Sequence, residues 1–157
     1  MTAAVAFSNP TVPNISDYIL FIQQQMGIGP AFLPVDSFWI ATTFNVAMEV
    51  ANDQMNLVSP TLYTLMIYNL AGDRLVNFAQ DQPAKTFFQT LRRKLHITAF
   101  YGGTVLNASD AGTASSALPP DSFKMLTLQD LQTLKTPWGR TYLAFAMQAG
   151  SALVGLS

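Results

Sequence analysis

Apolar side chains recur every three or four positions along much of the chain, which is the spacing that lines one face of a helix. In the first such segment they are Ile15, Ile19, Ile22 and Met26. Asn14 or Ser16 can cap the free backbone N–H groups at the start of this helix, and Gly27 is suited to end it. Residues 1–13 have two prolines and no apolar period, so we expect an extended arm there.

Two further helices follow after a run of helix breakers. Asp36 is expected to cap the second helix. Its apolar face comprises Ile40, Phe44, Ala47, Ala51 and Met55. Ser59-Pro60 predicts the start of the third helix, because serine caps free N–H groups and proline suits the first helical turn. Its apolar stripe comprises Tyr63, Met66, Ile67, Leu70, Ala71, Leu75 and Phe78.

A fourth helix is expected from Ala84, after the break at Asp81-Gln82-Pro83. Its apolar side carries Phe87, Phe88, Leu91 and Leu95. The basic residues around the other side are Lys85, Arg92, Arg93 and Lys94. Residues 98–121 are rich in Gly, Ala, Ser and Thr, which predicts a long loop. Residues 100–106, around Gly102-Gly103, are a candidate β-hairpin within it. We interpret this segment as an interaction loop.

Residues 122–150 are expected to form the C-terminal helices. Thr127 and Asp130 resemble the capping box of a short helix that carries Leu128, Leu131 and Leu134. Thr136-Pro137 predicts the start of the last helix, which is lined by Trp138, Tyr142, Phe145 and Ala149. Gly150 is expected to end that helix and leave residues 151–157 as an uncharged tail.

Together these patterns predict one mainly α-helical domain over residues 1–157. We expect a small bundle of about five to six helices, with a helical core at residues 14–97, a long loop, and extended N- and C-terminal arms. Half of the residues are hydrophobic and only 11% are charged, well under the roughly 25% of an ordinary soluble domain. Such a surface is expected to be covered by sibling subunits, another protein or a bilayer, and we favour protein partners.

The charges are divided unevenly along the chain. Residues 1–73 contain five acidic and no basic residues, a net charge of −5, whereas residues 74–157 contain eight basic and four acidic residues, a net charge of +4. One interpretation is that folding scatters these charges over a solvated surface. The other is head-to-tail association of identical chains, in which Glu49 and Asp53 of one subunit approach Arg92, Arg93 and Lys94 of the next.

No residues with catalytic spacing stand out. The one histidine, His96, lies beside basic residues and has no expected partner, and the chain contains no cysteine. Glu49 and Asp53 are four residues apart on a predicted helix, which suggests two solvated acids. Gly27 and Gly29 lack the lysine and hydroxyl residue of a phosphate loop. We therefore predict no catalytic, cofactor-binding or metal-binding residues.

A membrane role is an alternative, because residues 141–157 carry no charge. Gln148, Gly150 and Ser151 interrupt that run, and its length is at the lower limit for a membrane span. A groove on a partner protein explains this stretch better than lipid does.

The order of elements resembles the head-to-tail adaptor proteins of tailed bacteriophages, which form connector rings beneath the portal. The resemblance covers residues 15–97 and has low specificity. It rests on Phe21-Ile22-Gln23-Gln24-Gln25-Met26-Gly27-Ile28, on Asp36 before a helix with Ala47 and Val50-Ala51, and on Ser59-Pro60 before Tyr63 and Tyr68-Asn69-Leu70-Ala71. The long loop departs from the simplest members of the family.

This resemblance implies a virion protein assembled in the host cytoplasm. The homo-oligomeric ring, commonly of twelve subunits, would contact the phage portal and the next tail or collar protein and leave a channel for DNA. The C-terminal segment would reach the portal, and the expected anchors are Trp138, Arg140, Tyr142, Phe145, Leu153 and Leu156. The alternatives are another virion component, such as a decoration or tail-completion protein, and a small membrane-active protein.

Overall fold

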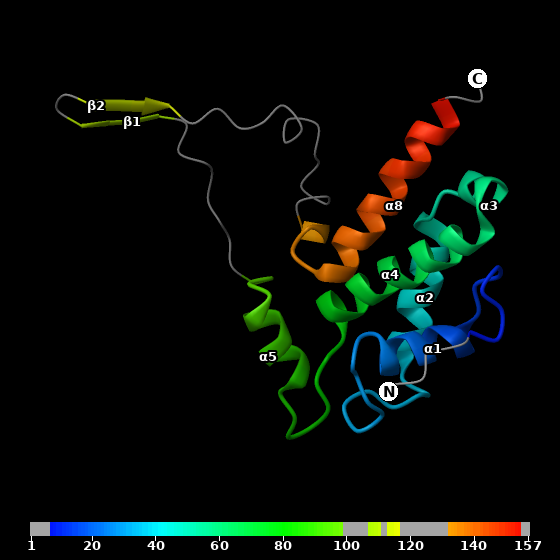
Figure 1. Ribbon diagram of the computed structural model, residues 1–157. Coiled ribbons are helices and arrows are strands. Elements are labelled where there is room, and N and C mark those ends of the chain that lie inside the picture. Colours follow the sequence, from blue (N-terminus) through cyan, green and yellow to red (C-terminus); the bar gives the residue numbers. More distant parts are fainter. Residues whose placement is uncertain (1–6, 99–106, 111–112, 117–131, 155–157) are drawn as a thin grey trace, which may run out of the picture.

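The Ser59-Pro60 pair begins the helix on which the other helices pack, α4 (Pro60–Phe78). Ser59 Oγ accepts a hydrogen bond from the backbone N–H of Leu62, and Pro60 occupies the first turn, as predicted. Twelve of the 19 residues of α4 are buried, more than one helix face can supply. In the computed structural model (Figure 1), α4 contacts five other helices: α1 (Ile15–Gln24), α2 (Phe38–Val50), α3 (Gln54–Val58), α5 (Phe87–Lys94) and α8 (Pro137–Val154).

The structure describes residues 7–98, 107–110, 113–116 and 132–154. Within these ranges the chain is mainly helical, which confirms the predicted fold class. Two short strands, β1 (Asn107–Asp110) and β2 (Thr113–Ser116), pair antiparallel with Asn107 opposite Ser116. The hairpin predicted at residues 100–106 lies outside the described residues, as does most of the short helix predicted around residues 128–134.

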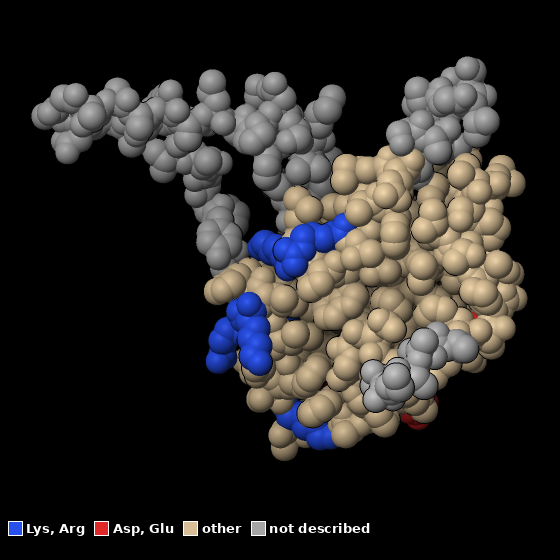
Figure 2. All heavy atoms as spheres, viewed as in Figure 1, with Lys and Arg blue, Asp and Glu red and all other residues tan. Residues whose placement is uncertain are grey.

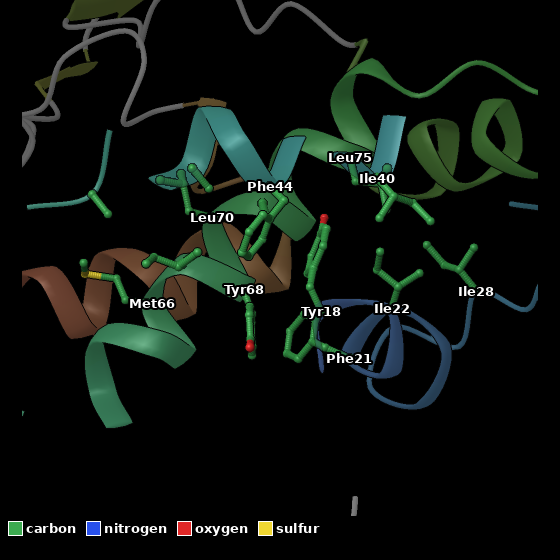
Figure 3. Close-up of a cluster of buried hydrophobic side chains, with 14 of the residues drawn as sticks. Tyr18, Phe21, Ile22, Ile28, Ile40, Phe44, Met66, Tyr68, Leu70 and Leu75 are labelled. Carbon is green, nitrogen blue, oxygen red and sulfur yellow. The ribbon is translucent and has the colours of Figure 1, made fainter. Parts of the chain in front are cut away.

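Aromatic rings from three helices form the centre of the core (Figure 3). The ring centroid of Tyr18 lies 5.6 Å from that of Phe44 and 6.0 Å from that of Tyr68, so α1, α2 and α4 meet at this stack. The buried Tyr18 hydroxyl lies 3.2 Å from Thr43 Oγ1, which satisfies its hydrogen-bonding capacity inside the core. Ile22 and Leu75 extend the apolar cluster on one side of the rings.

The described part of the N-terminal arm folds back on α1 and α4. The ring of Phe7 lies 5.5 Å from that of Tyr68. Asn14 is the N-cap of α1, and its side chain accepts a hydrogen bond from the Asp17 N–H, as the sequence indicates. The helix ends at Gln24, and Gly27 follows with a φ of 69°, a backbone conformation that glycine adopts without strain.

The Asp17 carboxylate fastens this arm to α1. It is fully buried and accepts four hydrogen bonds at 2.8–2.9 Å, from the Ser8 N–H, the Ser8 hydroxyl, the Asn9 N–H and the Asn14 side-chain amide. Burial alone would raise the pKa of Asp17, but these donors outweigh it and lower the pKa to about 2.

Helix α2 is shorter than predicted at both ends. Its N-cap is Ser37, whose hydroxyl accepts a hydrogen bond from the Trp39 N–H, so the expectation that Asp36 caps this helix was wrong. At the other end Ala51 is extended, and the Asn52 side chain accepts a hydrogen bond from the Gln54 N–H. This local turn competes with the helix, so Met55 belongs to the separate helix α3.

Helix α5 begins at Phe87, three residues after the predicted start at Ala84. Ala84 has a φ of 62°, outside the helical region, and so belongs to the turn before the helix. The Asp81 carboxylate caps α5, accepting hydrogen bonds from the N–H groups of Phe88 at 2.7 Å and Gln89 at 2.9 Å. The sequence placed Asp81 in the preceding break without assigning it this role.

Helix α8 begins at Pro137, as predicted, and the Thr136 hydroxyl accepts a hydrogen bond from the Gly139 N–H at 2.8 Å. The prediction that Gly150 ends this helix was wrong, because the helix continues to Val154. The extended tail predicted at residues 151–157 is therefore helical over its first four residues. Gly139 cannot be replaced by a residue with a side chain without a clash, because a Cβ atom there would lie 1.9 Å from the backbone oxygen of Thr133.

We expect Gly139→Ala to lower the free energy of unfolding by about 1–3 kcal/mol, because the added methyl group forces the backbone at Thr133 away from α8. Gly29→Ala is the matched control, since nothing lies within 4 Å of its added Cβ, and its effect should stay within about 0.5 kcal/mol. Urea unfolding followed by circular dichroism measures both. Equal stability of the two variants would contradict the close approach of α8 to Thr133.

The Asp17 hydrogen bonds should make the fold acid-sensitive. Because folding lowers the pKa of this carboxyl, its contribution to stability is present above the unfolded value of 3.8 and is lost as pH falls through about 2. Asp17→Asn should reduce stability at pH 6 and flatten its dependence on pH between pH 5 and pH 2. Ser8→Ala, which removes one of the four hydrogen bonds, should give an intermediate slope. Denaturant titrations across this range test the ordering, and a wild-type slope in Asp17→Asn would refute it.

Candidate interaction surfaces

The junction between α4 and α8 depends on a buried carboxylate. Asp73 of α4 accepts a hydrogen bond from the Thr136 hydroxyl at 2.6 Å and another from the Asn77 side chain. Burial raises the pKa of Asp73, and the Thr136 bond and the charge of Arg74 oppose that rise only in part. Since Thr136 also caps α8, this contact fixes where the last helix starts on the body of the molecule.

The aromatic residues predicted to anchor a partner on α8 are used in part within the chain itself. Trp138, Tyr142 and Phe145 are half-buried and pack against the core, because their spacing places them on the side of α8 that faces α4. Each keeps some exposed surface. They therefore contribute to the fold whether or not a partner also contacts them.

The other predicted residues of the last helix differ in position. Arg140 is exposed. Leu153 lies in the helical part of the backbone, and Leu156 lies outside the described residues. Met147 was not predicted, yet it is 69% exposed. It follows Trp138 by nine residues, or about two and a half turns, which places it on the opposite face of the helix.

The two predicted acidic residues do not share a helix. Glu49 lies exposed in the last turn of α2, whereas Asp53 follows the end of α2 and precedes α3. The Tyr63 hydroxyl donates a hydrogen bond to Asp53 at 2.6 Å, which places Asp53 beside the first turns of α4. Burial of the Tyr63 ring, together with the Asp53 carboxylate, raises the pKa of Tyr63 to about 12.

The basic run on α5 is divided between an internal and an external role. Arg92 Nε donates to the carbonyl of Val76 at 2.9 Å, and its guanidinium also reaches the carbonyl of Ala79, so it satisfies acceptors at the C-terminal end of α4. Arg93 and Lys94 are exposed. Figure 2 shows the Lys and Arg side chains along the side of the molecule formed by α5 and the start of α8.

Exposed apolar side chains gather near the N-terminal end of α4, on a surface that we call the α3 tip: Val50, Leu57 and Val58. Leu57 is 87% exposed, the highest value among the large apolar residues described. The sequence pattern does not single it out, because the apolar spacing of α2 continues to Met55 and predicts a helix across the break.

A second apolar surface lies between α2 and the C-terminal half of α4. It encloses a hollow of about 70 Å³, which we call the α2–α4 notch and which is lined by Trp39, Thr42, Thr43, Val46, Arg74 and Phe78. Phe78 is half exposed, and Phe38 next to Trp39 is 71% exposed. Arg74 Nε is buried without a hydrogen-bond partner among the described residues. The surface exposed in the notch is entirely apolar, because no polar atom of Arg74 or of the two threonines is exposed there.

A wider cleft of about 400 Å³ opens between the loop before α2 and the loop before α5. Phe32, Trp39, Asp36 and Asp81 are among its lining residues, and Asp81 is already bonded to the N-terminus of α5. His96, with a φ of 52°, is exposed beyond the end of α5 and does not line this cleft.

The described part of the chain contains neither a cluster of metal-binding side chains nor a helix suited to span a membrane. Among the residues whose side chains the structure describes, no three His, Asp or Glu side chains are grouped so that they could hold a metal ion. In the same part of the chain, no helix combines the length and the apolar character that crossing a membrane requires.

Sequence and structure were also compared with known proteins. No protein-family model, no curated protein and no solved structure matches the chain.

Proposed function

We propose that this chain is a non-enzymatic structural subunit of a bacteriophage virion. Copies of it form a ring that docks beneath the capsid portal, connects it to the next tail or collar protein, and leaves a central channel for DNA. The observation that carries the proposal is the exposure of large apolar side chains on a body with few charges: Leu57, Phe38 and Met147 are each more than two-thirds exposed. Burial of such groups against protein neighbours favours association.

The mainly helical fold supports this proposal because it agrees with the architecture that the resemblance to head-to-tail adaptors implies. A ring subunit needs separate surfaces for its siblings and for the proteins above and below. The α3 tip and the α2–α4 notch are two such surfaces, and the exposed side of α8, with Arg140 and Met147, is a third. We assign the C-terminal part of α8 and the residues after it to the portal.

The distribution of charged residues favours one orientation of neighbouring subunits. Asp53 and Glu49 lie toward the N-terminal end of α4, and Arg92, Arg93 and Lys94 lie beside its C-terminal end. A subunit with opposite charges at its two ends favours head-to-tail contacts with copies of itself over contacts between like ends.

The decisive experiment is the measurement of mass in solution, for the purified chain alone and mixed with a portal protein. We expect a closed assembly many times the mass of one 17.1 kDa chain, formed alone or on the portal. Multi-angle light scattering and electron microscopy of negatively stained particles would report its mass and shape. A chain that stays monomeric at high concentration and does not bind the portal would contradict the proposal.

Reversal of the exposed basic charges on α5 should weaken assembly more than folding. In Arg93→Glu combined with Lys94→Glu, both substituted side chains are exposed, so the free energy of unfolding should fall by only about 1 kcal/mol, through the loss of two cations from the last turn of α5. The loss of assembly should be smaller at high salt, where charges are screened.

Arg92→Met is the contrasting variant for this test. It leaves the carbonyls of Val76 and Ala79 without their donor, and we expect it to cost about 1–3 kcal/mol of folding stability. Denaturant unfolding measures folding stability and sedimentation velocity measures assembly, each for the wild type, the double charge reversal and Arg92→Met. Unchanged assembly of the double charge reversal would remove α5 from the interface.

A further inference from the structure

Two carboxylates, Asp17 and Asp73, are buried in the described part of the chain, and their hydrogen bonds differ. Asp17 accepts four hydrogen bonds, two of them from backbone N–H groups. Asp73 accepts its two on one oxygen, Oδ1, from the Thr136 hydroxyl at 2.6 Å and the Asn77 amide at 3.3 Å. The other oxygen, Oδ2, is therefore a place where a proton can bind without breaking either bond.

Asp73 lies where α8 attaches to α4. The two helices lie side by side (Figure 1), and Thr136, which donates to Asp73, directly precedes α8. The Asp73 side chain is 1% exposed in this arrangement. When α8 leaves α4, Asp73 loses the donor hydroxyl and the protein atoms that α8 places around it, and water can solvate the carboxylate. The attached and detached forms of α8 thus give this carboxyl different environments.

The groups that bond to Asp73 are neutral, although charged residues lie on the elements around it. Arg74, the next residue on α4, is a cation whose charge lowers the pKa of Asp73. The charged residues that bond elsewhere are Asp17 of α1, Arg92 of α5 and Lys135 before α8. Those that are exposed are Glu49 of α2, Arg93 and Lys94 of α5, and Arg140 of α8. Tyr142 of α8 packs against the core. Burial remains the largest influence on Asp73 and raises its pKa.

We propose that protonation of Asp73 controls the attachment of α8 to α4, and that the helix is held most firmly when a proton occupies Oδ2. The proton removes the charge that burial penalises and leaves the Thr136 hydrogen bond in place. The inference concerns a single chain and does not depend on the proposed ring. Acidification would hold the helix that we assign to the portal more firmly on the body.

The direction of the pH dependence follows from the two forms of α8. Since the pKa of Asp73 is higher in the attached form, the attachment is strongest below the ordinary value of 3.8 and weakens as the pH rises through the raised value. Asp17 responds in the opposite sense and only below 3.8, because its pKa is lowered to about 2. The two buried carboxyls therefore act in separate pH ranges.

Hydrogen exchange of the α8 amides, followed by mass spectrometry, tests this proposal. Asp73→Asn keeps the shape of the side chain and an oxygen that accepts from Thr136, but it cannot ionise. At each pH the wild-type exchange rate is divided by the Asp73→Asn rate, so that the intrinsic chemical rate cancels. We expect this ratio to rise above pH 3.8 by up to about tenfold per pH unit, and to level off above the raised pKa of Asp73.

Three further variants identify the source of the effect. Asp36→Asn removes an exposed carboxylate before α2 and is the matched control, in which the α8 amides should exchange as in the wild type at every pH. Thr136→Val removes the hydroxyl that lowers the pKa of Asp73, so it should loosen α8 and move the pH-dependent range upward. Thr136→Ser keeps a hydroxyl and should restore the wild-type range.

Two results would overturn the proposal. One is a ratio that does not change between about pH 4 and pH 8. The other is faster α8 exchange in Asp73→Asn than in the wild type at high pH, because the ionised carboxylate would then be the form that holds the helix. Either result leaves the proposed ring standing, since that proposal is tested by mass in solution.

Discussion

Burial of α4 on nearly every side is the constraint from which the rest of the structure follows. A helix that touches five others needs side chains of several sizes, and α4 supplies a large ring at Tyr68 and a small side chain at Ala71. It also needs partners for the polar groups it takes out of water. Asp73 finds Thr136 and Asn77, and the carbonyls of Val76 and Ala79 find Arg92. The apolar core and the buried hydrogen bonds are therefore two consequences of one packing arrangement.

The sequence predicts those features whose cause lies within a few residues. Asn14 caps α1 and Ser59-Pro60 starts α4, because each satisfies N–H groups in the turn that follows. Prediction from the sequence fails where the residue that ends or caps a helix lies further along the chain, or where a local turn competes with the helix. Asp81 caps α5 from seven residues upstream of Phe88, and Asn52 closes a turn that interrupts the apolar period of α2. Both rearrangements use side-chain hydrogen bonds that periodicity does not register.

The candidate surfaces were predictable only in part, for a related reason. A sequence identifies charged and aromatic residues but does not say which of them the fold uses internally. Arg92 bonds to α4 and Trp138 packs partly inward. Asp53 is exposed but bonds to Tyr63, which leaves Glu49, Arg93 and Lys94 as the exposed charged residues to which the structure assigns no internal role. Leu57 and Phe78 became visible as surface features only when the ends of α2 and the packing of α4 were known.

The Thr136 hydroxyl takes part in two hydrogen bonds at once, because it accepts from the first turn of α8 and donates to Asp73 of α4. Nucleation of the last helix and its attachment to the body are thereby coupled through one oxygen atom. A chain in which α8 is detached loses a cap for its first turn, and a chain without that turn orients the hydroxyl poorly toward Asp73. We therefore expect the C-terminal helix to form and to pack onto the body in a single cooperative step. A partner bound to α8 would then also stabilise the centre of the fold.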